Sequence, residues 1–306
     1  METKHICIMS TDDNPMGLKE VAEILQKGGT VGIPTETVYG LAANAYDPDA
    51  VARIFAAKGR PQDNPLIVHI ADINELPKIA AEIPETAKKL AAAFWPGPLT
   101  MVLKRTERIP PIISAGLDTV AVRMPSNEVA RAIINCSGLP LAAPSANLSG
   151  RPSPTTAKHV VDDLDGKIDA IVMSKDCSVG VESTVISLVD EKKRLLRPGG
   201  ITHEQLESVI GKVEIDPSVL SSELVAEVSS PGMKYKHYSP KTKIVIIEAD
   251  SQMFCDYVNR SVENCAAMWR ATGEKEFWEY SDIIDEQFPE MTFITDNCYS
   301  DPDFGY

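Results

Sequence analysis

The sequence predicts an α/β protein, and three observations lead to that fold class. Short apolar runs of strand length alternate with segments whose apolar residues recur at helical spacing. Many of the 22 prolines stand beside polar strings, and because proline fixes φ, the loops that carry those strings are stiff. Several polar strings follow strands directly, and loops at strand ends are where α/β proteins usually build their sites.

The first predicted elements are a helix, a strand and a loop. Apolar residues recur at helical spacing from Leu18 to Leu25, and Gly28 and Gly29 follow as a stop signal. The run TVGIP then predicts a strand. We expect the next string, PTETVYGLAANA, to be a loop that delivers hydroxyl groups at the end of that strand.

A second helix is predicted over residues 47–57. Asp49 is its candidate N-terminal cap, and Val51, Ile54 and Phe55 mark its buried side. Lys58 follows at the C-terminal end, where the helix dipole favours a cation. This placement alone would explain Lys58 without any functional role.

The remaining elements follow the same alternation. Apolar runs predict strands at LIVHI, TMVLK, TVAVRMP, LPLAA, DAIVMS and STVISLV, and helical patterns lie around residues 85–93, 126–135 and 156–165. Clear periodicity stops near residue 212, and KIVIIEAD starts a new strand after an irregular segment. We therefore divide the chain into a main body (residues 1–211), a linker (212–242) and a smaller unit (243–306).

Composition and charge exclude several classes of protein. No run approaches the roughly 18 apolar residues that would span a bilayer, so we expect a cytoplasmic protein. The six cysteines form no CxxC pair and no zinc-like cluster with histidine, which predicts reduced thiols. The net charge is −14, and 14 acidic but only three basic residues lie between Ile244 and Tyr306. This balance disfavours tight, sequence-independent nucleic-acid binding, yet leaves room for local clusters of cations that hold small anions.

The common nucleotide-binding motifs GxxxxGK[ST] and GxGxxG are missing, so any bound nucleotide must be held by basic and hydroxyl groups from several loops. The densest candidate cluster runs from Lys58 through Arg60 and Asn64 to His69. Arg60 offers a planar fork for phosphate oxygens, whereas Lys58 offers a point charge. The alternatives are a solvated helix end for the KGRP turn and a hydrogen-bonded core histidine for His69.

Further candidates follow later strands. Arg123 lies in the otherwise apolar run TVAVRMP, so it needs either a buried carboxylate partner or an anionic ligand. Ser145 and Asn147 lie in PSAN, which is either a ligand-binding turn or a plain hydrogen-bonded turn. Ser183 in GVEST and Arg197 in LLRPGG are weaker signals. Since GxSxG, HExxH and paired metal-ligand histidines are missing, covalent and zinc catalysis are disfavoured.

Taken together, the strings resemble one family. PTETVYGL, KGRPQDNPLIVHI, WPGPLT, AGLDTVAVRMP, PSAN, RPSPT, GVEST and LLRPG are similar, in order and spacing, to the YrdC-like domain of threonylcarbamoyl-AMP synthases. The string SPGMKYKHYSP further resembles the linker of the two-domain form. The resemblance implies a YrdC-like twisted mixed sheet with helices, then a linker and a small Rossmann-like α/β domain. The segment after Lys241 is shorter than the family's second domain.

The resemblance also implies a set of site residues. The threonine-binding positions fall on Thr37, His69, Arg123, Ala143 (through its backbone) and Ser183. The ATP-binding positions fall on Arg60, Asn64, Thr119, Ser145, Asn147, Ser153, Arg197 and Tyr235. Lys58 and Arg60 form the family's KxR pair and are the expected catalytic residues. Mg²⁺ is expected to arrive with ATP, and no metal site made by the protein is expected.

The implied activity is synthesis of threonylcarbamoyl-AMP from L-threonine, bicarbonate and ATP, a nucleotidyltransferase reaction. The product would supply a partner transferase that modifies adenosine beside the tRNA anticodon, and direct tRNA binding by this chain is not required. Two alternatives remain. One is an RNA-binding YrdC-like module without synthase activity. The other is a carbamoyl-transfer domain like that of the hydrogenase-maturation carbamoyltransferases, whose acylphosphatase-like and zinc-finger parts are missing here.

Overall fold

A computed structural model describes residues 2–62, 64–190 and 192–220 of the body, and residues 244–248, 252–253, 256–260 and 292–296 near the C-terminus. The chain separates into two compact units, residues 1–238 and 239–306, and each is described by itself.

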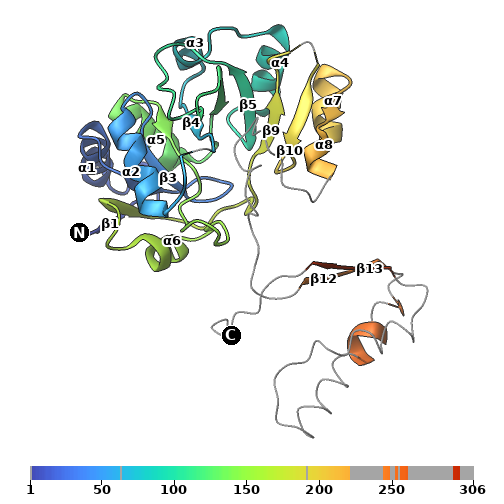
Figure 1. Ribbon diagram of the computed structural model, residues 1–306. Coiled ribbons are helices and arrows are strands. Elements are labelled where there is room, and N and C mark those ends of the chain that lie inside the picture. The colour runs from blue at the N-terminus through green and yellow to red at the C-terminus, as the bar shows by residue number, and fades with distance from the viewer. Residues whose placement is uncertain are drawn as a thin grey trace, which may run out of the picture. The chain divides into compact units, whose positions relative to one another are not determined.

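The first unit is built on an 11-stranded mixed sheet (Figure 1). In chain order the strands are β1 (Lys4–Cys7), β2 (Val31–Ile33), β3 (Gly40–Asn44), β4 (Ile67–His69), β5 (Leu99–Lys104), β6 (Thr119–Arg123), β7 (Leu141–Ala142), β8 (Ala170–Met173), β9 (Thr184–Ser187), β10 (Arg194–Arg197) and β11 (Glu214–Ile215). Across the sheet the order is β1-β8-β2-β3-β7-β4-β6-β5-β9-β10-β11. The sheet contains both parallel pairs, such as β4 with β6, and antiparallel pairs, such as β5 with β6, so the predicted mixed sheet is confirmed.

Helices cover both faces of this sheet. They are α1 (Pro15–Gln26), α2 (Pro48–Lys58), α3 (Leu76–Ile79), α4 (Glu85–Phe94), α5 (Glu128–Ser137), α6 (Ala157–Leu164), α7 (His203–Ile210) and α8 (Pro217–Leu220), with a 3₁₀ turn at Ile73–Glu75. Buried residues of α1 and α5 share one apolar cluster with β2, whereas those of α2, α4, α6 and α7 belong to another. The helices predicted near residues 18–25, 47–57, 85–93, 126–135 and 156–165 are therefore confirmed.

The cap of α2 differs from the prediction. The Asp47 side chain, not that of Asp49, accepts the backbone N–H groups of Asp49 and Ala50 at 3.0 and 3.3 Å. Pro48 occupies the first turn, where its missing N–H costs nothing, so the residue before it is the one that caps. Gly59 ends the helix at φ 60°, a left-handed conformation that glycine adopts without strain.

The prediction that PTETVYGLAANA is one loop is wrong in its second half. Gly40–Asn44 forms β3, which pairs antiparallel with β2. Leu41 and Ala43 face one apolar cluster while Ala42 faces the other, so a strand covered on both sides shows no polar alternation. Only the polar part of the string before Tyr39 remains a loop, and it reaches the site described below.

Because side chains alternate between the two faces along the central strands, part of one sheet face carries polar residues; we call this part the polar half-face. Val120 and Val122 of β6 join the cluster that packs under the helices, so Ala121 and Arg123 must point to the opposite face. The apolar cluster on that side contains Ile67, Val102, Ala121, Val185 and Leu196 and includes no residue of a described helix. The described helices therefore do not cover the polar half-face, which carries His69, Thr100, Arg123 and Ser183.

In the second unit β12 (Ile244–Glu248) pairs antiparallel with β13 (Thr292–Asp296), so the strand predicted at KIVIIEAD is present. The predicted Rossmann-like fold of this unit lies outside the described residues. Of the predicted linker, residues 212–220 belong to the first unit, where β11 pairs with β10, and residues 221–242 lie outside the described range. Among the described helices, none is long and apolar enough to cross a membrane.

Candidate active site

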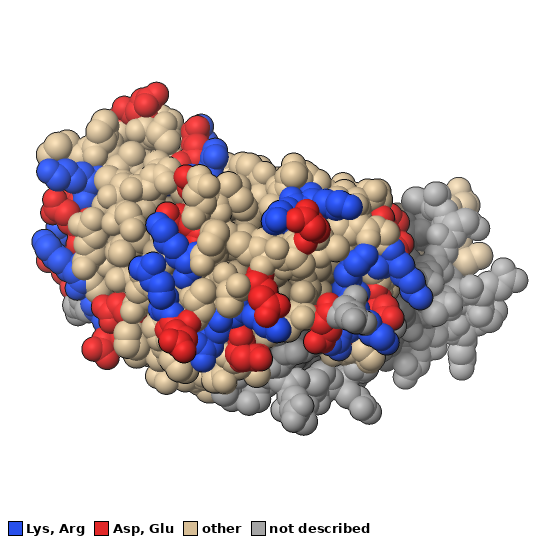
Figure 2. Space-filling view, turned by 90° about the horizontal axis from the view of Figure 1, so that it is seen from above, with Lys and Arg blue, Asp and Glu red and all other residues tan. Residues whose placement is uncertain are grey.

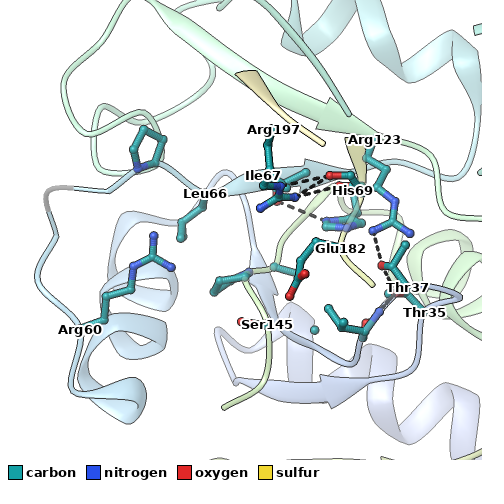
Figure 3. A pocket seen from close by; sticks show the side chains of 16 residues that line it. Thr35, Thr37, Arg60, Leu66, Ile67, His69, Arg123, Ser145, Glu182 and Arg197 are labelled. Carbon is teal, nitrogen blue, oxygen red and sulfur yellow. Dashed lines mark hydrogen bonds between the residues drawn. The ribbon is translucent and has the colours of Figure 1, made fainter. Parts of the chain in front are cut away.

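A cavity opens on the polar half-face, at the ends of β4, β6 and β9 (Figure 3). It is lined by Thr35, Thr37, Val38, Gly40, Arg60, Pro65, Leu66, Ile67, His69, Arg123, Ala143, Pro144, Ser145, Glu182, Ser183 and Arg197. These residues come from strands and loops spread over most of the first unit. The lining carries three guanidinium groups and one carboxylate, so the cavity suits a ligand with anionic groups.

Arg123 is anchored from below by an ion pair. Its Nη2 lies 2.7 Å from Oε1 of Glu36, and both side chains are about 95% buried, with 4% and 5% exposed. Burial acts to raise the pKa of Glu36, but the charge of Arg123 and nearby backbone N–H groups outweigh it, so the pKa is lowered and the carboxylate stays ionised. Arg123 thus has the buried carboxylate partner that the sequence analysis considered, and it also lines the cavity, where it can meet an anionic ligand.

The loop that carries Glu36 is held by its threonine hydroxyls. Arg123 Nη1 donates to Thr37 Oγ1 at 2.8 Å, and Thr37 Oγ1 lies 3.0 Å from Thr35 Oγ1. Thr35 in turn donates to the carbonyl of Val38 at 2.6 Å. This chain of bonds fixes the arginine and the Thr37 hydroxyl in one arrangement, facing the cavity together (Figure 3).

Ser183 joins two strands and an arginine. Its hydroxyl lies 2.7 Å from Thr100 Oγ1 of β5, next to β9 in the sheet. Arg197 donates from Nε and Nη2 to the Ser183 carbonyl at 3.1 and 2.9 Å, and from Nη2 to its hydroxyl at 3.2 Å. The guanidinium of Arg197 is therefore positioned at the cavity wall by Ser183.

His69 is fully inside the protein, 3% exposed, and its Nδ1 lies 3.3 Å from the Ile67 carbonyl. Burial first, and then the charge of Arg123, lower its pKa to about 3. The imidazole is therefore neutral near pH 7. It lies in the cavity lining, where it can exchange hydrogen bonds with a ligand, and its lowered pKa makes it a weak base.

Lys58 lies behind the cavity rather than in its lining. Its Nζ donates to the carbonyls of Ser145 and Asn147, the latter at 2.6 Å, and to Asn147 Oδ1 at 3.3 Å. Ser145 Oγ also donates to Asn147 Oδ1 at 2.6 Å. Burial and the charge of Arg60 lower the pKa of Lys58 to about 7. The KxR and SxN strings are thus joined, with the lysine shaping the turn that presents Ser145.

The structure brings most of the predicted site residues together. The lining contains Thr37, Arg60, His69, Arg123, Ala143, Ser145, Ser183 and Arg197. Behind it lie Lys58, Asn147 and Asn64, whose carbonyl accepts a bond from Arg60 Nη2 at 3.3 Å. These placements fit the predicted roles without testing them.

Besides Asn64 and Asn147, three predicted ATP-binding residues are not in the lining. Thr119 begins β6, two residues before Ala121, which pairs with Ile67 of the lining. Ser153 has a buried hydroxyl with no hydrogen-bond partner among the described residues, and it precedes Pro154, whose carbonyl accepts the Tyr39 N–H. Tyr235 lies outside the described residues.

Some residues of the site were missed by the sequence reasoning. Glu36, Thr35, Thr100 and Glu182 all lie inside strings that it singled out, namely PTET, WPGPLT and GVEST. The signal for Glu36 was available, because a buried arginine requires a carboxylate and PTET supplies one beside a candidate residue. No comparable signal existed for Thr100, since its role depends on the pairing of β5 with β9.

Comparisons with known proteins agree with this geometry. A family model described as telomere recombination (Sua5, YciO and YrdC proteins) matches residues 23–199, and a model for the threonylcarbamoyl-AMP synthase C-terminal domain matches residues 201–286. The threonylcarbamoyl-AMP synthase of Pyrococcus abyssi is 50% identical over 258 residues, covering 84% of this chain and 74% of the relative. That of Bacillus subtilis is 50% identical over 256 residues, covering 82% and 73%.

A solved structure gives the same result. The fold is similar to that of P. abyssi Sua5 complexed with L-threonine, with a TM-score of 0.82, 48% identity, and coverage of 89% of this chain and 78% of that one. This likeness and the two family models span both units. The chain therefore belongs to the Sua5/YrdC family of threonylcarbamoyl-AMP synthases.

Proposed function

We propose that this protein converts L-threonine, bicarbonate and ATP to threonylcarbamoyl-AMP and pyrophosphate. The observation that carries the proposal is the cavity itself. Eight of the residues expected to bind substrates line it, although they lie between residues 37 and 197 of the sequence. The curated relatives of about half identity are named for this activity.

Arg123 and its neighbours form the threonine side of the cavity. A guanidinium held by Glu36 and Thr37 is oriented in advance, so a substrate carboxylate meets two N–H donors with little loss of entropy. The hydroxyls of Thr37 and Ser183 and the neutral His69 can exchange hydrogen bonds with the substrate hydroxyl. The related P. abyssi structure holds L-threonine, which supports this assignment.

Arg60, Arg197 and Ser145 form the nucleotide side. Two guanidiniums on separate segments can contact different phosphates. The Ser145 hydroxyl, which here donates to Asn147 Oδ1, can turn to donate to one oxygen of the α-phosphate instead. Mg²⁺ bound to ATP would neutralise further phosphate charge, because the ion is usually held by substrate phosphates and few protein ligands. Lys58 would act here by holding the Ser145 turn.

The chemical step needs no protein nucleophile. The threonine amine, once it has lost its extra proton, and bicarbonate form a carbamate with loss of water. A carbamate oxygen then attacks the α-phosphorus of ATP and expels pyrophosphate, which makes the enzyme a nucleotidyltransferase. Catalysis is then positioning plus stabilisation of charge that develops on the phosphates. The product would serve a downstream transferase that modifies tRNA.

Product identity tests the proposal. The purified chain should be supplied with ATP, Mg²⁺, L-threonine and either ordinary or ¹³C-labelled bicarbonate, and its nucleotides analysed by mass spectrometry. We expect an AMP adduct of threonine that becomes one mass unit heavier with the labelled bicarbonate. An adduct without label would mean simple aminoacyl adenylation and would refute the proposed reaction.

The RNA-binding alternative gains little from the surface. On the face seen in Figure 2, lysine and arginine side chains are interspersed with aspartate and glutamate. Non-specific RNA binding instead requires cations that replace counterions along many phosphates. The interspersed charges on this face therefore do not favour RNA binding there.

A further inference from the structure

Glu182 lines the cavity but has no role in the proposed binding of threonine or ATP. It is the one carboxylate among the 16 residues that line the cavity. Figure 3 shows its side chain pointing into the cavity. Within the described residues, no ion pair to its side chain is formed, in contrast to Glu36, which is held by Arg123.

The backbone of Glu182 is fixed from two directions. Gly200 donates its N–H to the Glu182 carbonyl at 3.1 Å, and a Cβ on Gly199 would lie 2.3 Å from the same oxygen. Upstream in the same loop, Val179 donates its N–H to the Glu36 carbonyl at 2.8 Å. The loop that carries Glu182 is therefore held in place by contacts with the RPGG turn on one side and the PTET loop on the other.

The substrate chemistry shows what this carboxylate could bind. An α-amino acid brings an ammonium group with three N–H donors and a full positive charge. The residues expected to bind threonine offer a guanidinium, two hydroxyls, a neutral imidazole and a backbone group, and none of them is an anion. Without Glu182, the ammonium would face Arg60, Arg123 and Arg197 with no negative charge in the lining.

We infer that Glu182 binds the α-ammonium group of the amino-acid substrate and thereby selects amino acids over hydroxy acids. This inference rests on the proposed function. Ser183, the next residue, then contacts another polar group of the same substrate, while Arg123 takes its carboxylate. The substrate's ammonium group then meets an anion, its carboxylate meets a cation, and its hydroxyl meets hydroxyl groups of the protein. Charge-assisted bonds of this kind are the strong ones in a cavity.

Calorimetric binding without nucleotide or Mg²⁺ tests the inference. The ligands are L-threonine and 3-hydroxybutanoate, which keeps the carboxylate and the hydroxyl but lacks the ammonium. For Glu182→Gln we expect the Kd of threonine to rise about 10- to 100-fold, whereas that of 3-hydroxybutanoate stays within about threefold. Glu182→Asp, which keeps the charge, should retain most of the preference for threonine. Glu107→Gln, at an exposed position, is the matched control.

Each other outcome overturns the assignment. Equal losses for both ligands would mean that Glu182 only supports the loop. Unchanged threonine affinity in Glu182→Gln, with a raised Mg²⁺ requirement in turnover, would mean that the carboxylate serves the metal-bound nucleotide instead. A wild-type chain that binds no threonine would refute the proposed function, and this assignment with it. Thermal unfolding of each variant shows that binding is measured on folded protein.

Discussion

At the scale of single residues, the site depends on buried charges that satisfy each other. Arg123 and Glu36 lie on different segments, 87 positions apart in number, and form an ion pair of 2.7 Å. Removing one partner of such a pair leaves a buried charge without compensation, whereas removing both is far less costly. Comparing the single variants with the double variant therefore distinguishes the effect of the pair on stability from its effect on substrate binding.

The first prediction concerns that pair. Arg123→Ala should lower the free energy of unfolding by about 3–5 kcal/mol, because Glu36 is left buried and unpaired. Combining Glu36→Gln with Arg123→Met should recover part of the stability but none of the threonine affinity, as urea unfolding and calorimetry would show. Full threonine affinity in the folded double variant would remove Arg123 from the substrate site.

A second prediction concerns Lys58. Lys58→Met removes the donor to Ser145 and Asn147, so we expect a loss of about 1–3 kcal/mol in stability and a higher KM for ATP. The KM for threonine should change less, because the lysine does not line the cavity. Lys89→Met, on the exposed side of α4, is the control. Equal effects on both substrates would argue against a role specific to the nucleotide side.

The third prediction is a pH dependence of stability. The pKa of His69 is about 3 in the folded protein, against an ordinary value near 6.5. Below pH 6.5 the unfolded chain takes up a proton that the folded chain does not. The contribution of His69 is therefore present above pH 6.5 and is lost as the pH falls toward 3, by at most about 1.4 kcal/mol per pH unit. In His69→Gln the stability curve between pH 6 and 4 should be less steep, and an unchanged slope would contradict the assignment.

At the scale of elements, periodic helices and most apolar strands, short ones such as β2, β4 and β7 included, were predictable, whereas β3 and β1 were not. The helices that begin at Pro15 and Pro48 were predictable because their apolar residues recur at helical spacing and glycines follow their ends. β3 was hidden because its residues are apolar or small on both faces, and the four residues of β1 depend on pairing with β8 at the sheet edge. The motifs located the site, but only the strand pairing showed which hydroxyls and carboxylates meet there.

The fourth prediction belongs to the turn after β10. A Cβ at Gly199 would lie 2.3 Å from the Glu182 carbonyl and 2.5 Å from Thr184 N, so backbone must shift. We expect Gly199→Ala to cost about 1–3 kcal/mol and to weaken threonine binding by displacing Glu182 and Ser183. Gly138→Asn is the comparison, since φ is 66° there and nothing lies within 4 Å. A melting temperature and threonine affinity of Gly199→Ala equal to those of the unsubstituted chain would show that the close approach is unimportant.

At the scale of the whole molecule, the family relation covers more than the described site. The C-terminal family model matches residues 201–286, beyond the last residue of α8. We propose that residues 221–242, with Tyr235 and Lys236, help to retain the nucleotide during the reaction. Ending the chain after Leu220 keeps β11 paired with β10, so threonine binding should survive while ATP turnover falls. Unchanged turnover would show that these residues are dispensable.

The most direct test of the account is threonine-dependent release of pyrophosphate from ATP by the purified full chain, in the presence of bicarbonate and Mg²⁺. We expect release with L-threonine, little release without it, and little release from the folded Glu36→Gln/Arg123→Met variant. Release that is equal with and without threonine, or that persists in that variant, would contradict the claim that this cavity joins threonine to the nucleotide.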